Sequence, residues 1–193
     1  MDAEANEEVR FVVGTVVLAV NPLSPSAIAS LADQGRQEVM DLLRQIQSLL
    51  KLSKDPDTPV LPFHKSFPDF ITDPLRCPSK RLHVSPETGH LKLALSCLEL
   101  MNSLEQNAPS LPDYALNHEV EDLETRVKDH ISAALQYACK SWFSHLIEVR
   151  GDVIAIISVL RGFLEKRFPA WLEVLSVIWA MRDAIVALEK LMP

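Results

Sequence analysis

Proline residues divide this chain into short segments. Thirteen of its 193 residues are proline, whereas only five are glycine. Proline removes a backbone donor and interrupts helices, so this content predicts several separate elements rather than one long helix. The scarcity of glycine argues against a glycine-rich loop that cradles phosphates.

The composition is that of an ordinary globular protein. Hydrophobic residues make up 48% of the chain and charged residues 23%, so we expect one or two folded domains with a real core. The net charge of −7 disfavours a phosphate-binding surface, although a local basic patch remains compatible with it. The three cysteines, Cys77, Cys97 and Cys139, fit neither a disulfide framework nor a zinc pattern. We therefore expect reduced thiols and a cytoplasmic protein.

The most apolar run gives no indication of a membrane segment. Phe11–Val20 (FVVGTVVLAV) is too short to span a bilayer. It follows an acidic start, MDAEANEEVR, whereas a secretory signal has a basic one. We expect residues 1–10 to be a solvated lead-in, no membrane partner, and burial of the run itself.

Residues 11–75 are typical of a winged-helix-like domain. After the apolar run, Ser24-Pro25 is an N-cap with proline at the first helical position, which predicts a short helix over Ser26–Asp33. Gln37–Leu50 repeats apolar residues with a helical period. Two short extended runs then flank an Asp-Pro turn, Leu50–Ser53 before it and Pro59–His64 after it, which predicts a β-hairpin. Three helices followed by one hairpin is the order of a winged-helix module, with the hairpin as its wing.

Residues 76–193 predict a helical bundle, so the fold class is mainly α. A single helical turn over Ser66–Ile71 and a loop to Ser85 precede it. Ser85-Pro86 gives a second cap with proline at the first helical position. The remaining helices are predicted over Glu119–Trp142, the most regular of them, Asp152–Phe168 and Pro169–Leu191.

The chain offers no catalytic constellation, and we predict that it is not an enzyme. It has no GKS or GKT of a phosphate loop and no GxSxG of a nucleophile elbow. Cys139 and His145 lie six residues apart and would share a helix face poorly, which favours packing roles. We likewise place the tryptophans in the core and Glu121, Asp122 and Glu124 on a solvated face, with no metal ligands. The three tryptophans are Trp142, Trp171 and Trp179.

The winged-helix order of elements also suggests an alternative function, which is nucleic-acid binding. The third helix would then lie in the major groove and present basic or amide side chains. Gln37–Leu50 and the preceding Arg36 offer such residues, Arg44 among them, but Glu38 and Asp41 nearly cancel their charge. The sequence therefore disfavours a nucleic-acid partner.

The segment at the end of the predicted wing resembles a known family. PFHKSFPDFITDP, with His64 as its third residue, resembles the segment that follows the NACHT nucleotide-binding domain in fungal STAND NTPases of the NACHT–WD-repeat type. The similarity continues through VVGTVVLAVNPLSPSAIASL upstream, and through LKLALSCLELMNSLEQN, LPDYALNHEVEDLETRVKDHISAALQYACKSW and FLEKRFPAWLEVLSV downstream. It extends from about Phe11 onward as ordered blocks. The turn before the third helix, Leu31–Arg36, is shorter and more polar than is usual in the family.

The resemblance implies a regulatory and interaction module of a NOD-like signalling ATPase. In such receptors a histidine at the end of the winged helix contacts the β-phosphate of ADP bound to the NACHT domain and holds the receptor closed. By motif position that residue is His64. The implied partner is a NACHT domain, in cis or in trans, and the implied role is fungal self/non-self recognition or defence. The other interpretation of His64 is that it packs or caps at the exit of the wing.

The chain departs from the family because it carries no phosphate loop, Mg²⁺-binding acidic residues or arginine sensor, and no WD repeats. We therefore expect no cofactor in this chain itself, with ADP or ATP entering only through a NACHT domain. The resemblance implies a middle module: a truncated paralogue, a partial gene prediction or an excised fragment. Apolar faces left without a NACHT domain predict self-association.

Overall fold

The protein is mainly helical, as the sequence predicts. The structure is a computed structural model that describes residues 2–112, 116–150 and 154–191. Those residues form helices and a small antiparallel sheet of two strands. The chain divides into two compact units, residues 1–93 and 94–193. The sequence placed this division at 75/76, but the loop that follows packs with the first unit, where Val84 is buried and its N–H donates to the carbonyl of Ile71 at 3.0 Å.

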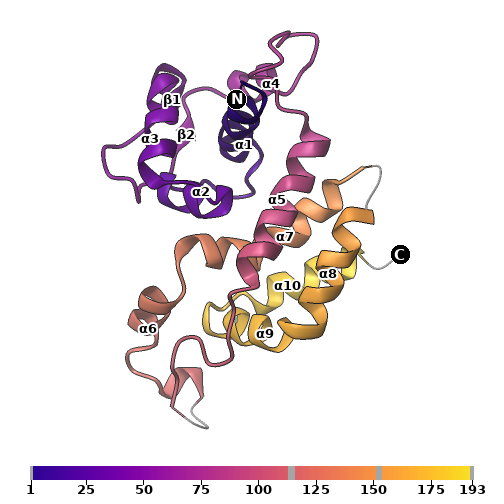
Figure 1. Ribbon diagram of the computed structural model, residues 1–193. Coiled ribbons are helices and arrows are strands. Elements are labelled where there is room, and N and C mark those ends of the chain that lie inside the picture. Colours follow the sequence, from indigo (N-terminus) through magenta and orange to yellow (C-terminus); the bar gives the residue numbers. More distant parts are fainter. Residues whose placement is uncertain (1, 113–115, 151–153, 192–193) are drawn as a thin grey trace. The chain divides into compact units, whose positions relative to one another are not determined.

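The first unit has three helices and a hairpin in the predicted order (Figure 1). Helix α1 packs against α2 and α3, and the hairpin strands lie beside them. Short helix α4 and the start of α5 follow. The elements are α1 (Asp2–Leu18), α2 (Pro25–Ala32), α3 (Arg36–Gln45), the 3₁₀ turn η1 (Gln47–Leu49), β1 (Leu50–Lys51), β2 (Leu61–Pro62), α4 (Ser66–Ile71) and α5 (Pro86–Met101).

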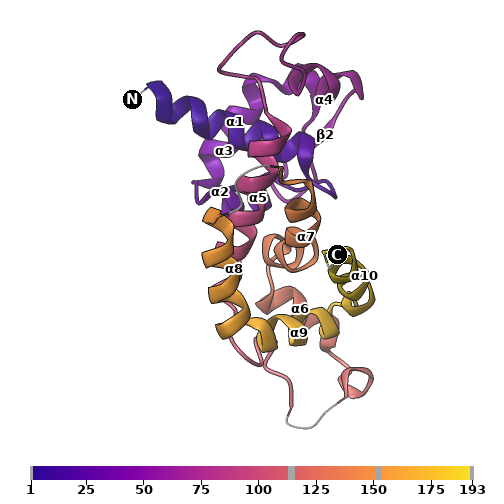
Figure 2. The same cartoon turned by 90° about the vertical axis from the view of Figure 1, so that its right-hand side faces the viewer.

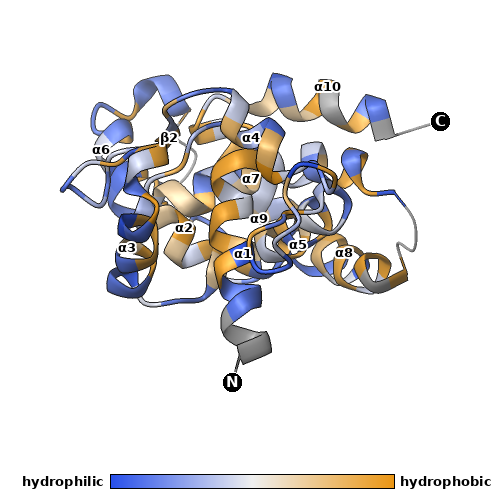
Figure 3. Ribbon diagram, turned by 90° about the horizontal axis from the view of Figure 1, so that it is seen from above, coloured by the Kyte–Doolittle hydropathy of each residue, from blue (hydrophilic) through white to orange (hydrophobic). Residues whose placement is uncertain are grey.

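Helix α1 begins at Asp2, inside the segment that the sequence assigned to a solvated lead-in. Residues 6–10 are mostly polar and residues 11–18 mostly apolar, and Figure 3 shows this change along α1 from blue to orange. Val12, Val13 and Thr15 are buried at the centre of the unit, whereas Val20, beyond the end of the helix, is 52% exposed. The predicted burial of the apolar run therefore does not extend to its last residue. The acidic residues that suggested a lead-in are instead favourable at the positive end of a helix, which explains the longer element.

Helices α2 and α3 begin where local capping groups stand. The Ser24 hydroxyl accepts the N–H of Ala27 at 3.2 Å, and Pro25 opens α2 as predicted. Asp33 ends α2 in the left-handed conformation, with φ 51°. At the next helix, the Glu38 carboxylate accepts the N–H of Gly35 at 3.0 Å, so the first turn of α3 is closed by its own side chain.

The hairpin is shorter than the predicted extended runs. Leu50 pairs with Pro62, and Lys51 with Leu61. Asp55 organises the turn by accepting the N–H of Asp57 at 3.0 Å, as an aspartate does when it mimics a backbone turn. The Val60 N–H donates to the Leu23 carbonyl at 2.9 Å, which fastens the wing to the entry of α2.

The second unit contains the rest of α5 and five further α-helices among its described residues. Helix α7 packs against α9 and α10, and Figure 2 shows α8, α9 and α10 around it. Within the described ranges, no helix is both long and apolar enough to cross a bilayer. The elements are η2 (Asn117–Glu119), α6 (Leu123–His130), α7 (Ala133–Glu148), α8 (Ile154–Lys166), α9 (Phe168–Val177) and α10 (Met181–Leu191).

The predicted helix over Glu119–Trp142 is wrong, because two helices occupy this stretch. Ile131 is extended, and the Ser132 hydroxyl accepts the N–H of Leu135 at 3.2 Å as the N-cap of α7. A serine inside a helical pattern can offer the backbone this alternative partner. At the start of α6, Arg126 Nε lies 2.8 Å from the Asp122 carboxylate.

The predicted helix over Pro169–Leu191 is also two helices, and this changes the place of one tryptophan. Trp179 lies in the left-handed conformation, with φ 58°, in the corner between α9 and α10. A continuous helix would keep it in phase with the buried face, but the break turns it outward and leaves it 72% exposed. The prediction that Trp179 belongs to the core is therefore wrong. The start of the predicted helix Asp152–Phe168 lies outside the described residues.

The other two tryptophans form an aromatic core. Trp142 of α7, Phe163 of α8 and Trp171 of α9 are each at most 2% exposed. Their ring centroids lie 5.8–6.0 Å apart in edge-to-face arrangements, the geometry that aromatic quadrupoles favour. The Trp171 indole also donates to the Cys139 carbonyl at 2.9 Å. This cluster ties three helices of the second unit together.

We expect Trp171→Ala to destabilise the second unit by about 3–5 kcal/mol, because it opens a cavity in a fully buried aromatic cluster. Trp179→Ala is the matched control, since it removes an exposed indole and should change stability little. Urea unfolding followed by tryptophan fluorescence measures both. Equal losses in the two variants would contradict this packing.

We expect Ser132→Ala to cost about 1 kcal/mol, because an N–H at the start of α7 loses its acceptor. Ser144→Ala, within the same helix, removes a hydroxyl that caps nothing and serves as the control. The same unfolding measurement applies. A Ser132→Ala variant as stable as the control would show that the break between α6 and α7 does not depend on this cap.

Candidate functional site

His64 stands at the exit of the wing and caps helix α4. The Ser66 N–H donates to His64 Nδ1 at 3.1 Å, and the Ser66 hydroxyl lies 2.8 Å from the same nitrogen. A backbone N–H can only donate, so Nδ1 carries no proton and the neutral ring holds its proton on Nε2. The imidazole is exposed. His64 thus performs the capping role that the sequence left open, and Nε2–H is the donor that remains on the ring.

An apolar surface surrounds His64. The ring lines a pocket of about 500 Å³ whose floor includes the buried residues Val13 and Phe67. Large apolar side chains remain exposed at its edge. They are Leu49 (43% exposed), Phe63 (58%) and Phe70 (42%). We call these three residues the wing-exit surface. Clustered aromatic exposure of this kind marks interaction sites on soluble proteins.

Arg76 adds a positive charge to the same pocket. It follows α4 in the loop, lines the pocket with His64 and is exposed. Its backbone is held by an N–H donated to the Asp73 carbonyl at 3.1 Å. A guanidinium and an imidazole N–H at one apolar pocket can together receive an anionic oxygen. Nothing in the sequence pattern singles out Arg76, because only the fold brings it to His64.

On the third helix, an acidic side chain binds two of the polar side chains that could contact nucleic acid. The Asp41 carboxylate accepts hydrogen bonds from Gln37 at 2.8 Å and Arg44 at 2.7 Å. These bonds, first from Gln37 and then from Arg44, lower the pKa of the Asp41 carboxyl. Figure 3 shows α3 as predominantly polar. Two of the side chains expected to read bases are thus engaged with an acid on their own helix.

The thiol and imidazole weighed as a catalytic pair are part of the second unit's core. Both Cys139 and His145 are fully buried, and His145 Nε2 lies 2.7 Å from the Tyr137 hydroxyl. Burial raises the pKa of the Cys139 thiol to about 12, so it stays protonated at neutral pH. Burial likewise raises the pKa of Cys97, with the neighbouring Cys139 as a smaller cause. These groups pack rather than react.

Across the residues that the structure describes, no group of three or more His, Cys, Asp and Glu is placed to hold a metal ion. The acidic residues of the α6 start, Glu121, Asp122 and Glu124, are exposed, as predicted. The Arg126 side chain, hydrogen-bonded to Asp122, lowers the pKa of that carboxyl.

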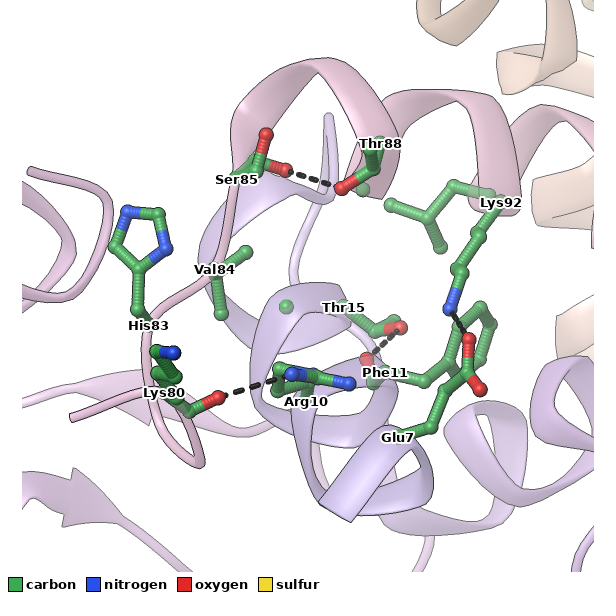
Figure 4. A pocket seen from close by; sticks show the side chains of 13 residues that line it. Glu7, Arg10, Phe11, Thr15, Lys80, His83, Val84, Ser85, Thr88 and Lys92 are labelled. Carbon is green, nitrogen blue, oxygen red and sulfur yellow. Dashed lines mark hydrogen bonds and ion pairs between the residues drawn. The ribbon is translucent and has the colours of Figure 1, made fainter. Parts of the chain in front are cut away.

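A second pocket of the first unit lies on α1, among residues that the sequence did not single out. It measures about 470 Å³ and is lined by α1, the segment before α5, and the first turns of α5 (Figure 4). Arg10, Lys80 and Lys92 line it together with Glu7. Sequence patterns could not group these residues, because up to 85 positions separate them.

Comparison with models of protein families, with curated proteins and with solved structures finds no match to this chain.

We expect the three buried thiols to be unreactive in the native protein. An aromatic disulfide reagent at pH 8 should label Cys77, Cys97 and Cys139 only slowly, because the thiols are inaccessible and two have raised pKa values. As the control, the same chain unfolded in guanidinium should expose all three thiols, and the reagent should then label them rapidly. Fast labelling of Cys97 or Cys139 without denaturant would contradict the packing described.

Proposed function

We propose that this chain is a non-enzymatic regulatory and interaction module that docks against the NACHT ATPase domain of a STAND-type protein. The docking face is the wing-exit surface around His64. In this proposal the module helps to hold the ATPase in its inactive, ADP-bound state. The resemblance to fungal NACHT–WD-repeat proteins gives the context, which is cytoplasmic signalling in self/non-self recognition or defence.

The exposed apolar surface around His64 is the observation that carries this proposal. Phe63 and Phe70 flank the histidine and expose about half of their surface to solvent. Large aromatic side chains at the centre of an interface contribute much of its binding energy. A partner that covers them would also remove water from the imidazole and from Arg76, which strengthens any hydrogen bond made there.

The state of the His64 ring supports a role toward phosphate. Ser66 occupies Nδ1, so the ring is oriented and the available group is the Nε2–H donor. A fixed donor loses little freedom when it binds an anion. Arg76 lines the same pocket and supplies a charge for the same oxygen cluster. The module needs no cofactor of its own, since the nucleotide belongs to the NACHT domain.

The alternative, a standalone nucleic-acid-binding protein, has no comparable support. Arg44 and Gln37 are both bonded to Asp41 on the helix that would read the major groove. Binding of DNA would have to break these bonds as well as work against the overall negative charge.

The test uses this chain and a purified NACHT domain of a fungal STAND protein. His64→Asn keeps a side-chain oxygen that can cap α4 but removes the Nε2 donor. We expect the wild-type chain to slow ADP release. His64→Asn should reduce this slowing about ten- to a hundredfold, which is the range for the loss of one hydrogen bond to a charged group. Release of labelled ADP after dilution measures it.

Two further variants separate docking from nucleotide contact. Phe63→Ser should weaken binding to the NACHT domain itself, measured by titration calorimetry, because it removes an exposed apolar anchor. His118→Asn, at an exposed histidine of the second unit, is the matched control. Equal ADP retention with the wild type and with His64→Asn would rule out the sensor role, and absence of any binding would rule out the docking role.

A further inference from the structure

The pocket on α1 has an apolar floor. Phe11 and Val84 line it on two sides (Figure 4), and Leu93 of α5, which is 1% exposed, also lines it. Gly89 brings α5 close to α1, because a Cβ atom at this position would clash with Leu18. The volume of about 470 Å³ lies within the range of pockets that hold small molecules.

Positive side chains surround this apolar floor. Arg10 donates from its guanidinium to the Lys80 carbonyl at 2.9 Å, which fixes the arginine and leaves its other N–H groups available. The Lys80 side chain lines the pocket and makes no ion pair with any described residue. Lys92 pairs with Glu7, and the hydrogen bond from Lys92 lowers the pKa of that carboxyl. The charge in excess therefore comes from Arg10 and Lys80.

Hydroxyl groups complete the lining. Ser85 and Thr88 stand on the side of the pocket opposite Arg10 (Figure 4). The Ser85 hydroxyl can donate to a ligand or accept from it, whereas the Thr88 hydroxyl donates to the Ser85 carbonyl at 3.4 Å and can accept. The result is a local positive site with an apolar base in a chain whose net charge is −7. A cationic concavity in an acidic protein selects for anions by its local field rather than by overall attraction.

We infer that this pocket binds a small amphiphilic anion, in which a phosphate or carboxylate group is joined to an apolar body. Arg10 and Lys80 would hold the anionic group, and Phe11, Val84 and Leu93 would contact the body. None of these five residues lines the His64 pocket, so this site is independent of the proposed function.

Titration calorimetry on the full chain tests the inference with four probes. They are 1-naphthyl phosphate, 1-naphthoate, the neutral 1-naphthalenemethanol and inorganic phosphate. We expect at least one naphthyl anion to bind. The alcohol and inorganic phosphate should each bind at least tenfold more weakly, because the alcohol lacks the anionic group and inorganic phosphate lacks the apolar body. Comparison of the phosphate with the carboxylate identifies the preferred anionic group.

Arg10→Met and Lys80→Met keep the alkyl stems and remove the charges, and each should weaken binding of the naphthyl anion at least tenfold. Arg36→Met and Lys54→Met, at exposed positions outside the pocket, are the matched controls and should bind as the wild type does. Circular dichroism checks that the variants fold. The inference is overturned if neither anion binds, if the neutral alcohol binds equally well, or if the Arg10 and Lys80 variants bind as tightly as the controls.

Discussion

Burial of helix α1 is the constraint on which the first unit depends. Val12, Val13 and Thr15 are buried at its centre, and α2, α3 and the hairpin pack around it. The same helix also contributes to both pockets of this unit. Val13 lines the pocket of His64, whereas Arg10, Phe11 and Gly14 line the pocket on α1, which we call the cationic pocket. One hydrophobic segment therefore supports two surfaces of different chemistry, one mainly apolar and aromatic and the other cationic at its edge.

Local signals predicted the starts of elements better than their ends. Ser24-Pro25 and Ser85-Pro86 open helices as the sequence indicates, since an N-cap and a following proline act within one turn. Ser132 has the same capping ability but stands in a long apolar repeat, so the period concealed it. Trp179 was misplaced for a related reason. The sequence does not indicate its left-handed conformation, because the residue at this position is not glycine. The packing of α9 against α10 holds the turn.

The two candidate sites also differ in how far the sequence could predict them. His64 could be found from the motif that surrounds it, and its capping bond to Ser66 is local. Its neighbours Leu49 and Arg76 come from a 3₁₀ turn and a loop on either side of the hairpin and α4, and no periodicity links them. The cationic pocket depends still more on the fold, because Arg10 and Lys80 are 70 residues apart. Long-range placement of this kind follows from the core and is not encoded in any local pattern.

The bond between Ser66 and His64 has a consequence for the kind of group that the ring can recognise. Because Nδ1 accepts the Ser66 N–H, the neutral ring can meet a ligand only with the donor at Nε2. A ligand group that can only donate, such as an ammonium, would therefore gain no hydrogen bond from the ring. The short helix that follows, α4, carries Phe67 into the core and Phe70 onto the surface. His64 precedes this helix and Phe70 lies near its end, so a partner that contacts both would meet an oriented donor and an aromatic anchor at a spacing set by about one and a half helical turns.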